Sequence, residues 1–81
     1  MYGVYALFDR VRESYSNITI DNNDNTAKRS FLAAVANSHE LMYIAKDLEL
    51  RKVAEFDIHS GMMVPLAVSE FICYGSEYES V

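Results

Sequence analysis

One stretch of sequence decides the fold of this 81-residue chain: Val53-Ala54-Glu55-Phe56-Asp57-Ile58-His59-Ser60-Gly61-Met62-Met63-Val64. The stretch is typical of a strand, a tight turn and a returning strand. The Asp57 carboxylate can accept hydrogen bonds from the turn backbone, Ser60 can add another, and Gly61 can adopt the positive φ that closes such loops. We therefore expect a β-hairpin against which the rest of the chain packs.

The N-terminal part of the chain predicts two further strands. Residues 2–8 carry apolar side chains on both faces of an extended segment, which indicates either a central strand or one whose outer face meets a partner. The polar residues 9–14 indicate a turn. Residues 15–20 alternate again and predict a second strand, in which we expect Ile18 and Ile20 to face the core.

A dense group of short polar residues, 21–26, indicates the start of a helix, because such side chains accept hydrogen bonds from the free N–H groups of a first turn. Asn23 or Asp24 is the expected N-cap. An apolar stripe with helical spacing follows and predicts the face that packs on the sheet. Its members are Ala27, Phe31, Ala34 and Val35, with Leu32 at the edge. Asn37 and Ser38 end the helix.

Residues 39–52 fit two patterns. Apolar residues at helical spacing and good helix formers favour a helix, whereas the alternation from Leu48 onwards leads as a strand into the hairpin turn. We expect a strand from Leu48 to Asp57. Residues 39–47 stay open between a helical turn and a loop.

After the turn, residues 62–64 return as a strand. Pro65 has no N–H to donate and marks an edge, a bulge or a break. Residues 66–74 form a further extended segment, with Phe71 and Cys73 expected on one face. The sequence does not say whether this segment pairs within the chain or with another subunit.

These elements predict an α+β fold. A small antiparallel sheet of about four strands, in the order strand-strand-helix-strand-strand, carries one helix packed on one face. We expect a single domain over residues 1–75. The acidic residues 76–81 are expected to form a frayed C-terminal tail.

The composition limits the classes of function. The chain carries a net charge of −5, which argues against tight coating of DNA because phosphate neutralisation dominates that affinity. Its single cysteine allows no intramolecular disulfide. Since so small a domain buries only about 60–65% of its unfolded surface, a homodimer is an expected source of stability. No apolar run reaches a membrane span and no signal peptide opens the chain, so a cytoplasmic location without a membrane partner is expected.

No pattern of catalytic or metal-binding residues stands out. Cys73 is the only thiol, and neither His39 nor His59 can be placed beside it as a base. His39 and Glu40 have no second pair at zinc-ligand spacing. Most aspartates flank turns or caps, where carboxylates serve the backbone, and the isolated glycines form no phosphate loop. We expect no enzyme activity, no metal and no cofactor.

The basic residues occur in pairs that account for six of the seven: Arg10 and Arg12, Lys28 and Arg29, Arg51 and Lys52. With Tyr5 or Tyr15 they could form a patch that holds phosphates while a ring stacks on a base. The candidate nucleic-acid-binding residues are Arg10, Arg12, Lys28, Arg29 and Tyr15. The commoner alternative is a solvated surface with ordinary ion pairs.

Several short motifs occur in an order that resembles a known family. They are Tyr5-Ala6-Leu7-Phe8-Asp9, Thr26-Ala27-Lys28-Arg29-Ser30-Phe31, Lys46-Asp47, Ala54-Glu55-Phe56-Asp57 and Ser60-Gly61. In order and spacing they resemble the small non-structural protein of gokushovirus-type microviruses, which are phages with small circular single-stranded DNA genomes. Ala54 stands where that family usually has glycine, a Pro-Glu step is missing before Asp47, and residues from Ala67 onwards have no counterpart.

The resemblance implies a non-enzymatic, non-virion phage protein in the cytoplasm of the infected bacterial host. Such a protein is expected to assist replication or packaging of a single-stranded DNA genome. Its expected partners are a phage or host replication protein and, weakly, single-stranded DNA. The alternative is a protein-interaction or inhibitor module directed at a host factor, with no DNA role.

Overall fold

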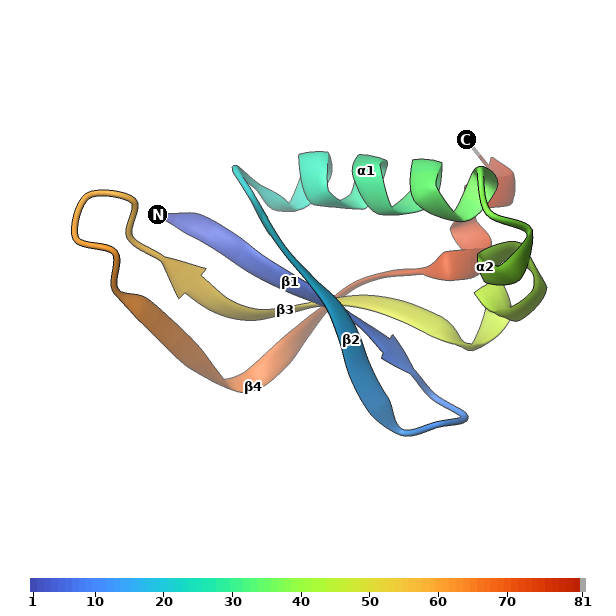
Figure 1. The fold of residues 1–81 in the computed structure, drawn as a ribbon, viewed down its shortest axis with the longest axis horizontal. Helices are drawn as coiled ribbons and strands as arrows, with labels where there is room; N and C mark the ends of the chain where they lie inside the picture. The colour runs from blue at the N-terminus through green and yellow to red at the C-terminus, as the bar shows by residue number, and fades with distance from the viewer. Residues whose placement is uncertain (81) are drawn as a thin grey trace.

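The computed structural model describes residues 1–80 and contains one sheet with a helical layer on one side (Figure 1). The elements, in chain order, are β1 (Tyr2–Asp9), β2 (Ser14–Asp21), α1 (Asp24–Ala36), α2 (His39–Ile44), the 3-10 helix η1 (Ala45–Asp47), β3 (Leu48–Phe56), β4 (Met63–Tyr74) and the 3-10 helix η2 (Gly75–Ser80). The expected α+β fold is confirmed.

The four strands are antiparallel and lie in the order β2-β1-β3-β4. The sheet is strongly twisted, so that its outer strands β2 and β4 cross in the view of Figure 1 while α1 runs along one side. β1 lies centrally, which is one of the two positions that its apolar faces indicated. Residues 66–74 pair within the chain, because they continue the returning strand as the second part of β4.

The core lies between the sheet and α1. Tyr5 and Leu7 of β1 pack there with Phe31 and Val35 of the helix. The Tyr5 hydroxyl donates to Asp24 Oδ1 at 2.7 Å, which ties β1 to the first turn of α1. Burial, together with this carboxylate, raises the pKa of Tyr5.

The buried face of α1 differs from the predicted apolar stripe. Leu32 is buried and Ala34 is exposed. The cause is η2, whose Tyr78 packs against the core and lines a cavity beside α1 with Leu32. The core-facing side of α1 is therefore rotated towards the C-terminal segment.

The local hydrogen bonds of the hairpin and of the helix cap agree with the predicted ones. Asp57 Oδ1 accepts from the His59 N–H at 2.9 Å, and Gly61, at φ 78°, donates to the Asp57 carbonyl at 2.7 Å. The hydrogen bond from the His59 N–H, with others from Ser60, lowers the pKa of the Asp57 carboxyl group. At the start of α1 the cap is Asn23, whose Oδ1 accepts from Thr26 N at 2.9 Å.

The prediction that Ile18 and Ile20 face the core is wrong. Their exposed fractions are 72% and 48%. β2 is an outer strand, and its pairing places Thr19 opposite Tyr5, on the side of the sheet that α1 covers. Because directly paired residues share a face, Ile20, opposite Val4, lies on the other side.

Two C-terminal predictions also differ from the structure. A bulge between the pairs Leu50–Cys73 and Arg51–Phe71 separates Phe71 from Cys73, so that they lie on opposite faces. Residues 75–80 form η2 instead of a frayed tail. η2 is held by the Tyr74 N–H, which donates to Glu77 Oε2 at 2.8 Å, and this hydrogen bond lowers the pKa of Glu77. Residues 39–47, which the sequence left open, are helical.

Candidate nucleic-acid interface

The side of the sheet away from α1, which we call the open face, has a distinct aromatic half. Cross-strand pairing builds it from two rows of residues. One row is Tyr15, Phe8, Glu49 and Tyr74, and the other is Ala6, Arg51 and Phe71. We call these two rows, with Arg10 and Ser69, the aromatic half.

Tyr15 spans this half. Its ring lies 4.8 Å from that of Phe8, centroid to centroid, and its hydroxyl is hydrogen-bonded to Ser69 Oγ at 2.9 Å. Since Tyr15 belongs to β2 and Ser69 to β4, the side chain bridges the two outer strands across β1 and β3. This bridge explains why Ala6 is only 2% exposed on a face that no helix covers.

All three nitrogens of the Arg51 guanidinium contact other residues of the protein. Its Nη1 lies 2.7 Å from Glu49 Oε1, its Nε donates to Ser69 Oγ at 2.8 Å, and its Nη2 donates to the Ser69 carbonyl at 2.9 Å. These contacts fix the guanidinium between β3 and β4. We therefore regard Arg51 as a structural support of the aromatic half.

Arg10 is held more loosely. Its side chain is 45% exposed, its Nε lies 3.6 Å from Glu49 Oε2, and its guanidinium carbon lies 5.3 Å from the centre of the Tyr74 ring. Its Nη2 also donates to the Lys46 carbonyl. A long ion pair and a cation–π contact are weak interactions at an exposed site, so Arg10 is the cation of this half that an incoming anion can attract.

Three rings of the aromatic half offer free surface. Tyr15, Phe71 and Tyr74 are 48%, 44% and 43% exposed, and the Phe71 and Tyr74 rings lie 4.7 Å apart. Half-exposed rings on one face of a sheet, with a guanidinium beside them, have the chemistry that stacks unpaired bases and holds a phosphate.

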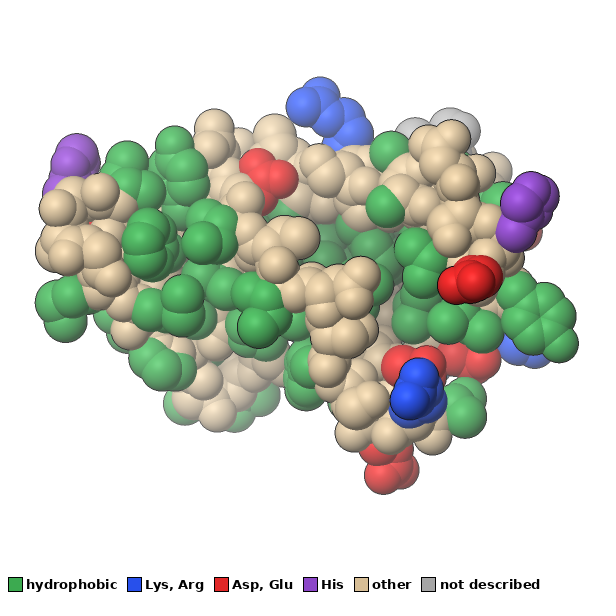
Figure 2. Space-filling view, in the orientation of Figure 1, with side chains coloured by type: hydrophobic (Ala, Val, Ile, Leu, Met, Phe, Trp, Pro, Cys, Tyr) green, Lys and Arg blue, Asp and Glu red, His purple; other side chains and the backbone are tan. Residues whose placement is uncertain are grey.

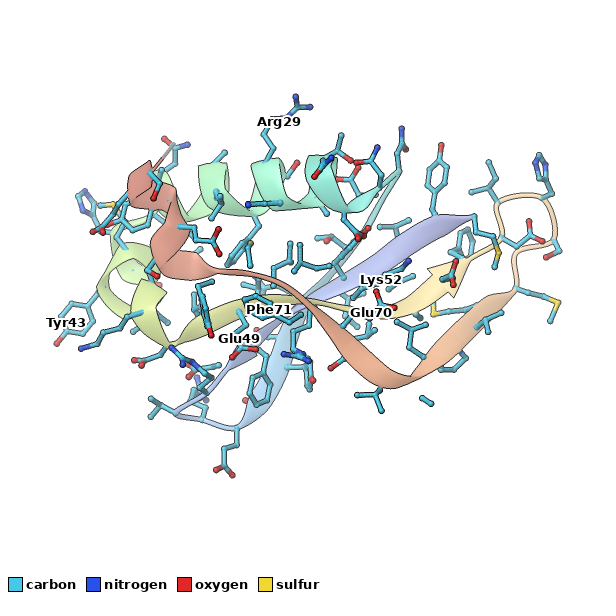
Figure 3. The ribbon with its side chains drawn as sticks, turned by 180° about the vertical axis from the view of Figure 1, so that it is seen from behind. Arg29, Tyr43, Glu49, Lys52, Glu70 and Phe71 are labelled. Carbon is cyan, nitrogen blue, oxygen red and sulfur yellow. The ribbon has the colours of Figure 1, made fainter. Side chains whose placement is uncertain are left out.

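The five residues proposed from the sequence for nucleic-acid binding do not lie together in the structure. Arg10 and Tyr15 both lie at the aromatic half, and Arg12 lies in the turn after β1. Lys28 and Arg29 lie on α1, across the sheet. Lys28 is 3.3 Å from Glu77, and Arg29 points away from the sheet (Figure 3).

No sequence pattern assigned Phe71 or Tyr74 to the candidate site. Figure 3 shows Phe71 near Glu49, where the strands cross. Simple alternation assigns Phe71 to the same face as Cys73, and only the bulge between them moves the ring to the open face. Such a bulge has no sequence signal at this position.

The remaining reactive groups have structural surroundings. Burial raises the pKa of the Cys73 thiol to about 11, with Glu77 contributing, and the side chain is completely buried. Within residues 1–80, no three side chains of His, Cys, Asp or Glu are gathered as metal ligands would be. No helix in that range has the length and apolar character needed to cross a bilayer.

Comparison with known proteins places the chain in a family. No curated protein and no solved structure matches it. The model of one family, described as Phage ORF5 protein, matches residues 2–78. Because this match spans nearly all of the 81 residues, the chain belongs to the Phage ORF5 protein family.

Proposed function

We propose that this phage protein is a non-enzymatic accessory protein of a gokushovirus-type phage and that it assists replication or packaging of the single-stranded DNA genome. Two lines of support are its membership of the Phage ORF5 protein family and the order of its sequence motifs. The work would take place in the cytoplasm of the infected bacterium, together with a phage or host replication protein.

The aromatic half carries the DNA part of this proposal. Tyr15, Phe71 and Tyr74 each leave close to half of their surface free. Every base has a π-face that can stack on such a ring, and each stacked base contributes about 1–3 kcal/mol. Arg10 lies over Tyr74 and can exchange its contact with Glu49 for one with a phosphate.

Charge limits how strongly DNA binds. The net charge of the chain is −5, whereas the aromatic half contains Arg10 and Arg51 against Glu49 alone. Repulsion by the whole molecule and attraction by a single loosely held arginine make the affinity weak. Base stacking then supplies most of the free energy of DNA binding. The protein also needs contacts with a protein partner to perform its function.

The test uses the intrinsic fluorescence of the tyrosines, because the chain contains no tryptophan. Titration with a single-stranded oligo-dT should quench this fluorescence, and the logarithm of the binding constant should fall with the logarithm of the salt concentration with a slope of about −1. Tyr74→Leu and Phe71→Leu should each weaken binding roughly 10-fold. Tyr43→Leu is the matched control, because Tyr43 is 86% exposed on α2.

Two results would contradict the DNA role. One is the absence of binding at low salt. The other is binding that the leucine variants of Phe71 and Tyr74 leave intact while Arg29→Ala weakens it, because that pattern would assign DNA to α1 instead of the open face.

The acidity of the chain favours a second candidate function, that of an inhibitor or adaptor of a host factor without any DNA role. A molecule of net charge −5 repels phosphates but can bind a basic protein surface. Capture of one host protein from infected cells, free of DNA and unchanged after nuclease treatment, would favour this candidate.

A further inference from the structure

The other half of the open face differs in chemistry from the aromatic half. Two rows of paired residues build it. One row is Tyr2, Phe56 and Met63, and the other is Ile20, Val4, Ala54 and Pro65. None of these residues is charged. We call them, with the flanking Ile18, the apolar half.

The rim of the apolar half is open to solvent. Met63 is 51% exposed and Ile20 is 48% exposed, while Ile18 reaches 72%. Figure 2 shows hydrophobic side chains gathered at the end of the molecule that carries the β3–β4 hairpin. Contiguous apolar patches of several hundred Å² commonly mark sites of protein contact.

We propose that the apolar half binds the same half of a second copy of this chain, related by a two-fold axis. Two copies each carry a net charge of −5, and like charges brought together cost several kcal/mol. A stable contact between them must therefore use a surface without charged side chains, which the apolar half provides. A two-fold axis sets the same patch against itself, as the commonest homodimers do.

Packing face to face explains the exposed residues better than pairing of strand edges does. Ile18 and Ile20 belong to β2, whereas Met63 and Pro65 belong to β4 at the opposite edge of the sheet. Addition of a strand to one edge would cover only one of these two pairs. Packing of two open faces covers both pairs at once, with sheets roughly 10 Å apart.

The area available suits a dimer of moderate affinity. The exposed apolar side chains of this half amount to roughly 400–500 Å² per copy, on the scale of 60–120 Å² for a whole aliphatic side chain. Two copies then bury on the order of 1,000 Å², near the lower limit for specific interfaces. The proposal is independent of DNA binding, since the aromatic half stays outside the contact.

The experiment measures the mass in solution by light scattering and the dissociation constant by sedimentation equilibrium. The full chain should give a mass near twice its 9.2 kDa. Ile20→Glu and Met63→Glu should each place two like charges near the axis and weaken association at least 10-fold. Tyr43→Glu adds the same charge at an exposed aromatic residue outside this half, and its dissociation constant should equal that of the wild type.

Thermal unfolding shows whether each variant is folded. If one glutamate variant does not fold, the other is sufficient for the test. A mass of 9.2 kDa for the wild type at high protein concentration would overturn the proposal. A dimer that persists unchanged in a folded Ile20→Glu or Met63→Glu variant would also overturn it, and so would one that Tyr43→Glu weakens equally.

Discussion

Glu49 is 9% exposed because two arginines neutralise it from opposite sides. Arg51 is bound in turn by Ser69, which also bonds Tyr15. The chain of contacts runs from β2 to β4 and fixes the position of the rings that remain exposed. A support of this kind lets a loosely held Arg10 move without disturbing the rings.

Gly75 lies where the backbone of η1 leaves no room for a side chain. A Cβ at this position would lie 2.6 Å from the Ala45 carbonyl oxygen and 3.1 Å from Leu48 Cβ. Gly75→Ala should therefore lower the free energy of unfolding by about 1–3 kcal/mol, measured by urea denaturation. Ser76→Ala, at the exposed neighbour, is the control. Equal stability of the two variants would show that η2 and η1 separate freely.

Residues whose role depends on nearby sequence were predictable. Asp57, Gly61 and Asn23 act on backbone groups within two to four positions of themselves; sequence identified the first two and narrowed the cap to Asn23 or Asp24. Phe71 and Ile18 were placed on the wrong face. Their orientation depends on a bulge and on which strand lies at the edge of the sheet, and both are set by distant partners.

Among the elements, η2 differs most from what the sequence predicted. Its acidic composition predicted a frayed tail, yet Tyr78 packs against the core and Glu77 pairs with Lys28 of α1. One apolar side chain among polar neighbours has no periodicity to reveal it. The hairpin and α1 were predictable because their patterns extend over whole elements.

Tyr78→Ala tests whether η2 stabilises the domain. Loss of a partly buried ring that covers Leu32 should lower the free energy of unfolding by about 1–3 kcal/mol. Glu79→Ala changes an exposed residue of the same element and should leave the free energy within about 0.5 kcal/mol of wild type. Similar small effects in both variants, measured by chemical denaturation, would mean that η2 contributes nothing to stability.

At the scale of the whole molecule, the buried thiol predicts a loss of stability at alkaline pH. The pKa of Cys73 is about 11 in the folded chain against 9.0 ordinarily, because burial disfavours the thiolate. Below pH 9 both states keep the proton and stability is unaffected. Between pH 9 and 11 only the unfolded chain loses it, so the free energy of unfolding should fall by about 2 kcal/mol.

Cys73→Ala isolates this effect. The alanine variant should lose less stability over the same pH interval, measured by denaturation at each pH. Part of the decline should remain, because burial also raises the pKa of Tyr5. An equally steep decline in both proteins would assign the effect to other groups.

The architecture was predictable from sequence, whereas the arrangement of the candidate site was only partly so. Turn residues, the helix cap and alternation determine the order of elements and the single helical layer. The site depends on which strands become neighbours, and in a sheet ordered β2-β1-β3-β4 residues as distant as Tyr15 and Ser69 meet. Arg10 and Tyr15 were proposed from residue type, as one of a pair of basic residues and an aromatic residue, and the structure places both at the aromatic half.

The place of Cys73 and Tyr78 in the core has a consequence for how the protein is made. Cys73 pairs with Leu50 beneath the helix, and Tyr78 packs beside Leu32. While a ribosome still encloses residues 63–80, β4 and η2 cannot form, and the apolar surfaces of β3 and α1 remain uncovered. The core can close only after these residues have left the ribosome, so the native fold is reached late in the synthesis of this domain.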